Sequence, residues 1–91
     1  MKPGRKFVEV GSSACSDAEL LAILLGSGGP GYSALDCANA VLERFGTLAS
    51  RMGKPLRDLA GIRGVGAVKA IRIAAAFELS ARILQHLERN E

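Results

Sequence analysis

The fold predicted for this 91-residue chain rests on one stretch, Leu59-Ala60-Gly61-Ile62-Arg63-Gly64-Val65-Gly66-Ala67-Val68-Lys69-Ala70. Three glycines are spaced among apolar residues at its centre, and apolar sequence stands on both sides. Glycine allows backbone angles that a Cβ atom forbids, and it lets the main chain approach another surface closely. The stretch therefore predicts two packed helices joined by a tight glycine hairpin, which we call the second hairpin.

The segments around this hairpin carry helical patterns. After it, apolar residues recur every three or four positions over 67–88, which predicts one long amphipathic helix. Before it, we predict short helices over 47–52 and 56–60, the latter with Pro55 in the first-turn position that proline suits. The apolar stripe of the long helix consists of Ala70, Ile73, Phe77, Ala81, Leu84 and Leu87.

The first half of the chain has its own helix signals. Residues 16–19, Ser-Asp-Ala-Glu, have the form of a capping box, in which the serine hydroxyl and the glutamate carboxylate each accept a free backbone N–H. The helix that follows is predicted to end at Gly26. Ser33 and Asp36 predict the start of another helix, which ends at Gly46.

A weak internal repeat appears when the sequence is shifted by 35 positions. Glycines of a first hairpin, residues 26–31, then fall on Gly61, Gly64 and Gly66, and apolar helix positions fall on one another. We therefore predict an all-α, compact five- to six-helix domain built from two helix-hairpin-helix units. Residues 1–15 are expected to form an N-terminal arm, 16–88 the tandem helix-hairpin-helix domain, and 89–91 a tail or the start of a linker.

Composition excludes several classes of protein. The longest strictly apolar run, 20–25, is far shorter than the roughly 20 residues of a membrane span. The basic residues at the start are not followed by the apolar stretch of a secretory signal. Cys15 and Cys37 lie 22 positions apart, with no second Cys or His at metal-ligand spacing. We expect a cytoplasmic protein with reduced thiols, no metal and no cofactor.

Positive charge is concentrated in one third of the chain. Residues 44–72 carry seven basic side chains against the single acid Asp58, a net charge of +6. Three of these cations, Arg63, Lys69 and Arg72, surround the second hairpin. Free amides at the start of a helix, with the positive end of its dipole behind them, form a ready phosphate site. The candidate binding residues are Arg63, Gly64, Val65, Gly66, Lys69 and Arg72, and Lys69 is expected on the exposed face.

The first hairpin differs, because no Lys or Arg occurs between Lys6 and Arg44. Its predicted role is packing.

Residues 2 to about 82 resemble the N-terminal domain of the bacterial RadC-like (DNA repair protein RadC) family. The resemblance is carried by Pro3, Glu9, Gly11, Ser16-Asp17-Ala18-Glu19-Leu20-Leu21-Ala22-Ile23-Leu24-Leu25, Gly31, Ser33-Ala34-Leu35, Leu42-Glu43-Arg44-Phe45-Gly46-Thr47-Leu48, Ile62-Arg63-Gly64-Val65-Gly66, Lys69-Ala70 and Glu78-Leu79. In such proteins a C-terminal metal-hydrolase domain of the JAB/MPN type follows, with a His-x-His pair and an Asp. This chain contains a single histidine, His86, so it resembles an N-terminal module without the catalytic part.

The resemblance implies a non-sequence-specific DNA-binding module of a DNA repair protein, which contacts backbone phosphates of duplex or branched DNA through the second hairpin. Related helix-hairpin-helix domains also suggest a monovalent cation on the carbonyls of Ala60, Ile62 and Val65.

Helix-hairpin-helix glycosylases need a catalytic Asp downstream of the hairpin, and none occurs after Asp58. We therefore expect no enzyme and no catalytic residue. The alternative is a protein-interaction or regulatory domain for the metal-hydrolase domain.

Overall fold

The computed structural model describes residues 1–51 and 54–89, and among those residues it contains helices and connecting loops but no β-strand. The α-helices are α1 (Pro3–Val10), α2 (Asp17–Leu25), α3 (Ala34–Phe45) and α4 (Ala67–Arg89). One 3-10 segment, η1 (Ser12–Ala14), lies between α1 and α2, and two more, η2 (Ala49–Arg51) and η3 (Leu56–Leu59), lie between α3 and α4. The predicted all-α class is confirmed. No helix in this described part of the chain is long and apolar enough to cross a membrane.

The predicted count of five to six helices is not confirmed. Within the described residues, two of the expected short helices are 3-10 turns, η2 and η3. Positions 52 and 53, where the first of them was expected to end, lie outside the described residues, as do positions 90 and 91 of the predicted tail. The region expected as an N-terminal arm contains α1, with Pro3 at its first position.

Local capping explains where α2 and α3 begin and end. Both predicted caps are confirmed as complete capping boxes: the Ser16 hydroxyl accepts from the Glu19 amide, and the Ser33 hydroxyl accepts from the Asp36 amide, each at 3.1 Å. Each helix ends at a glycine with a φ of 80°, a conformation that side chains with a Cβ disfavour.

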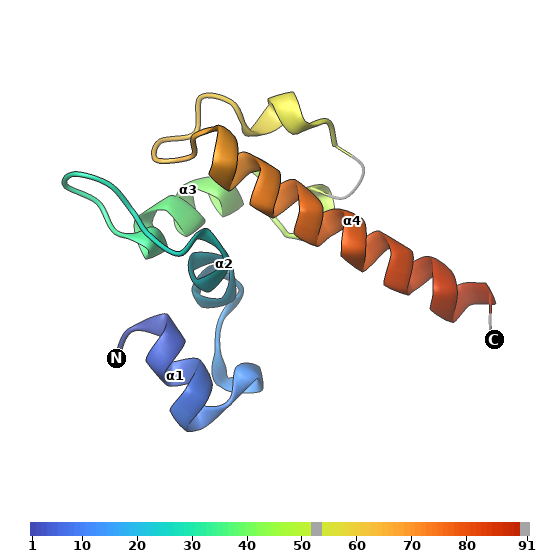
Figure 1. Cartoon of the computed structure of the whole chain (residues 1–91), viewed down its shortest axis with the longest axis horizontal. Helices are drawn as coiled ribbons and strands as arrows, with labels where there is room; N and C mark the ends of the chain where they lie inside the picture. The colour runs from blue at the N-terminus through green and yellow to red at the C-terminus, as the bar shows by residue number, and fades with distance from the viewer. Residues whose placement is uncertain (52–53, 90–91) are drawn as a thin grey trace.

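The core lies where α2, α3 and the start of α4 meet. Figure 1 shows α4 running beside the other two helices and then extending beyond them toward the C-terminus. Only the first half of α4 therefore packs, and Ile73 is its buried residue. The buried side chains are Leu21, Ala22, Leu25, Cys37, Ala38, Val41, Leu59, Ile62 and Ile73. Leu84 and Leu87, predicted on the core stripe, are more than half exposed because they lie in the projecting part.

An ion pair joins α1 to the cap of α2. The Glu19 carboxylate accepts from the Ser16 amide and from the Lys6 ammonium, both at 2.9 Å. The hydrogen bond from the Ser16 backbone amide is the largest cause that lowers the pKa of the Glu19 carboxyl below its ordinary value, and the hydrogen bond from Lys6 is the next.

We expect this carboxylate to make the fold sensitive to acid. Because its pKa is lower in the folded state, its contribution is fully present above the unfolded pKa and is lost as pH falls through the folded value. Glu19→Gln keeps a capping side chain without the charge. Its melting temperature should be lower than that of the unmutated chain at neutral pH, and the two should converge in acid. If the difference in melting temperature between the two proteins persisted in acid, the stabilisation could not come from the charge of Glu19.

Candidate nucleic-acid interface

The second hairpin is a tight turn that leads directly into α4. The Val65 amide donates to the Ile62 carbonyl at 3.0 Å, which closes a four-residue turn. Gly64 occupies its third position with a φ of +83°, the geometry that favours glycine in a type II turn. A Cβ on Gly64 would overlap the Cys37 sulfur and the Tyr32 ring, so glycine is required there for space as well.

The amide end of α4 faces solvent. Gly66 precedes the helix, and its backbone has no neighbouring atom within 4 Å of where a Cβ would lie. Gly66, Ala67 and Val68 are exposed. The first amides of a helix have no intrahelical acceptor and carry the positive end of the dipole. This end of α4 therefore offers exposed donors suited to an anion.

Lys69 is not on a freely exposed face. It is half-buried, and its Nζ donates to the Gly28 carbonyl in the first hairpin at 3.1 Å. The expectation of an exposed Lys69 is wrong, because the two hairpins lie side by side and the first one supplies an acceptor.

Arg72 makes a similar contact one turn later. Its Nη1 donates at 3.3 Å to the carbonyl of Leu25, the last residue of α2. A cation at the carbonyl end of a helix is stabilised by the helix dipole. The hydrogen bonds of Lys69 and Arg72 thus connect the start of α4 to the first hairpin and to the end of α2. Both cations lie close to the second hairpin in the chain.

Arg63 differs from Lys69 and Arg72 in the kind of contact that it makes. It is exposed at the tip of the second hairpin, and its Cζ lies 4.7 Å from the centroid of the Tyr32 ring. This cation–π contact orients the guanidinium group without using its hydrogen-bond donors. The structure thus brings the six predicted residues of the second hairpin and α4 together at one end of the domain.

Arg44, at the C-terminal end of α3, is a further cation at this site that sequence reasoning did not single out. Its Nη1 donates to the carbonyls of Asp58 and Ala60 at 3.1 and 3.4 Å, just before the second hairpin. The Ala60 carbonyl, suggested as a cation ligand, thus already has an arginine donor. The signals in the sequence were its place in the last turn of a helix and its membership of the basic segment 44–72.

The first hairpin has a structure of its own. Gly29 and Tyr32 exchange backbone hydrogen bonds of 3.0 and 3.1 Å around Pro30 and Gly31. Its positive-φ glycines, 26 and 31, are five positions apart, whereas Gly61 and Gly64 are three apart. The pairing predicted from the 35-residue shift is therefore wrong at the later glycines: in conformation Gly31 corresponds to Gly64, because the first hairpin is longer.

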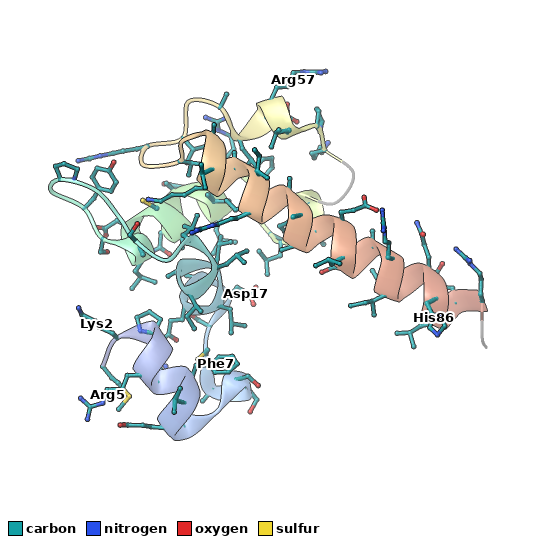
Figure 2. The ribbon with its side chains drawn as sticks, viewed as in Figure 1. Lys2, Arg5, Phe7, Asp17, Arg57 and His86 are labelled. Atoms are coloured by element: carbon teal, nitrogen blue, oxygen red, sulfur yellow. The ribbon has the colours of Figure 1, made fainter. Side chains whose placement is uncertain are left out.

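Two acidic residues, Asp36 and Glu43, line pockets that Arg63 also lines, whereas several other charged residues lie away from this site. Figure 2 shows Lys2 and Arg5 on α1, and His86 near the far end of α4, well away from the two hairpin loops. Arg57 projects outward from η3 in the same view. Among the described residues, no group of three or more His, Cys, Asp or Glu side chains is placed to hold a metal ion.

The family model and the relatives that this chain matches belong to the same family. The family model described as UPF0758 N-terminal matches residues 1–71. The chain is 46% identical to a UPF0758 protein of Cupriavidus taiwanensis over 91% of its length, and 42% identical to one of Xanthomonas euvesicatoria over 99%. A UPF0758 protein of Staphylococcus epidermidis is 40% identical over 90% of the chain.

The chain spans 36 to 40% of the length of these three relatives. No solved structure matches it. The match to the family model over most of the chain, and the high identity to the relatives, show that the chain belongs to the UPF0758 N-terminal family, the RadC-like N-terminal region.

Proposed function

We propose that this domain is a non-sequence-specific DNA-binding module of a RadC-like DNA repair protein, acting in the cytoplasm and without catalytic activity of its own. In this proposal α2 and α3 flank the first hairpin, η3 and α4 flank the second, and each set is a helix-hairpin-helix unit. The observation that carries the proposal is the exposed amide end of α4 beside the guanidinium of Arg63.

In this proposal the three cations have two different roles, which follow from their contacts. Arg63 and the amides of Gly64, Gly66 and the first turn of α4 would bind phosphate oxygens directly. Lys69 and Arg72 donate to backbone carbonyls of the first half of the domain, so they hold the binding surface together and add positive potential. Phosphate contacts of this kind position a protein on DNA without reading its sequence.

A second candidate function is supported by an apolar groove between α2 and α4. Its lining includes Leu20, Leu24, Phe77 and Leu84, and its volume is about 410 Å³. A groove of this kind suits a protein partner, which in a longer relative would be the metal-hydrolase domain. In that case the domain would act as a protein-interaction or regulatory module.

The salt dependence of DNA binding distinguishes the two functions. If two to four phosphates are bound, log affinity for duplex DNA should fall with log salt with a slope of roughly −0.9 per phosphate. Fluorescence anisotropy with single-stranded, duplex and branched DNA measures this slope directly. Salt-dependent binding to any of these supports the DNA-binding module. Absence of binding to all three at low salt would contradict it and leave the protein-interaction module.

A further inference from the structure

A small pocket, which we call the hairpin pocket, lies between the two hairpins. Its volume is about 290 Å³, near the lower end of the roughly 300 to 1,000 Å³ that is typical of small-molecule pockets. A space of this size suits a small group such as one flat ring system. The lining comes from both hairpins and from α3: Gly31, Tyr32, Asp36, Cys37, Ala40 and Arg63.

The Tyr32 ring is fixed in position between the hairpins. It lies against Gly29 and Gly64, since a Cβ atom on either glycine would overlap atoms of the ring. The Cζ atom of Arg63 is 4.7 Å from the ring centroid, and Tyr32 itself is only half-buried. Nucleobases stack on phenol rings and on guanidinium planes, and both groups line this pocket. Tyr32 and Arg63 therefore provide stacking surfaces that are in place before any ligand binds.

The carboxylate of Asp36 determines which part of a nucleotide suits the pocket. Asp36 is exposed at the start of α3, where the Ser33 amide donates to its Oδ2 at 2.8 Å. A carboxylate repels a phosphate, but it accepts hydrogen bonds from the amino groups of bases, and its two oxygens have room for several donors. The hairpin pocket is therefore suited to a base, whereas the amide end of α4 is suited to a phosphate.

We propose that the hairpin pocket binds one unpaired nucleobase of DNA, which stacks on Tyr32 and Arg63. This inference rests on the proposed DNA-binding function and narrows its ligand to DNA that contains unpaired bases. Arg63 belongs both to the pocket and to the proposed phosphate site, so a phosphate bound there brings a neighbouring base to the pocket. A base in an intact duplex must first leave its stack and its partner, which costs free energy, whereas an unpaired base is already available.

The proposal gives the first hairpin a binding role in addition to the packing role predicted for it. Every base has a π face, so stacking on Tyr32 tolerates any sequence. This agrees with phosphate contacts that do not read sequence. The domain would then select DNA by its structure and not by its sequence.

Two DNA probes that differ by a single base test the pocket. Both are the same duplex with one extra nucleotide bulged out of one strand, which is a cytosine in the first probe and an abasic sugar-phosphate in the second. The two probes therefore carry the same phosphates. We expect the unmutated chain to bind the cytosine bulge at least about fivefold more tightly, because stacking on an aromatic side chain contributes this much per base. Fluorescence anisotropy at one low salt concentration measures the ratio of the two dissociation constants.

Variants of Tyr32 connect this preference to the pocket. Tyr32→Leu removes the ring and should bring the ratio close to one, whereas Tyr32→Phe keeps the ring and should retain the preference. Phe7→Leu is the matched control, since it replaces an aromatic ring by leucine on α1, which Figure 2 shows away from the hairpin loops. It should leave the ratio unchanged. The ratio separates the loss of base stacking from any general loss of affinity through Arg63.

The outcomes separate this proposal from the proposed function. Equal affinity of the unmutated chain for the two probes would overturn the base pocket and leave the DNA-binding module standing, and this comparison needs no variant to fold. A preference for the cytosine bulge that survives Tyr32→Leu, in a variant that circular dichroism shows to be folded, would overturn it as well. Absence of binding to both probes and to plain duplex would contradict the DNA-binding function and the pocket together.

Discussion

Gly64→Ala is expected to lower the free energy of unfolding by about 2 to 5 kcal/mol, a large part of the total for a domain of this size. Two costs add. The residue has a φ of +83°, which a side chain with a Cβ disfavours, and the new methyl group would overlap the Cys37 sulfur and the Tyr32 ring. Cys37 is buried in α3, so it has little room to move. Urea denaturation followed by circular dichroism measures the change.

Gly66→Ala is the control within the same hairpin. Nothing lies within 4 Å of where its Cβ would be, so the only expected cost is the weaker preference of alanine at a helix N-terminus, about 1 kcal/mol or less. A similar loss in both variants would show that the packing of the second hairpin against Cys37 and Tyr32 contributes little to stability.

Arg63→Glu is expected to weaken DNA binding at least about tenfold at low salt and to reduce the slope of log affinity against log salt by about one or more. The substitution removes an exposed cation at the tip of the second hairpin and puts a carboxylate beside the phosphate site. Arg63 makes a cation–π contact with Tyr32 at the surface, so stability should change little. Anisotropy titrations at several salt concentrations, with melting curves in parallel, measure both effects.

Arg89→Glu makes the same change in net charge at the far end of α4 and is the matched control. At about 0.1 M salt it should reduce affinity only slightly, because ions then screen interactions between exposed charges that are more than about 10 Å apart. Lys69→Glu is a poorer test, because it also removes the hydrogen bond to Gly28 that joins the hairpins. Equal losses in Arg63→Glu and Arg89→Glu would mean that net charge alone governs binding.

Local sequence determined where most helices begin and end. A capping box needs only residues three positions apart, so Ser16 with Glu19 and Ser33 with Asp36 could be recognised directly. A glycine that ends a helix acts through its own φ, as at Gly26 and Gly46. The start of α1 at Pro3 carried a weaker signal and was not predicted.

The sequence by itself also determined the family, the all-α class and the gathering of positive charge in residues 44–72. Tertiary structure alone decided what each cation does. Lys69 and Arg72 reach carbonyls 41 and 47 positions earlier in the chain, and Arg44 reaches those before the second hairpin. The physical reason is that a long cationic side chain takes the nearest unpaired acceptor in space, and only the packing of the two hairpins side by side fixes which carbonyl that is.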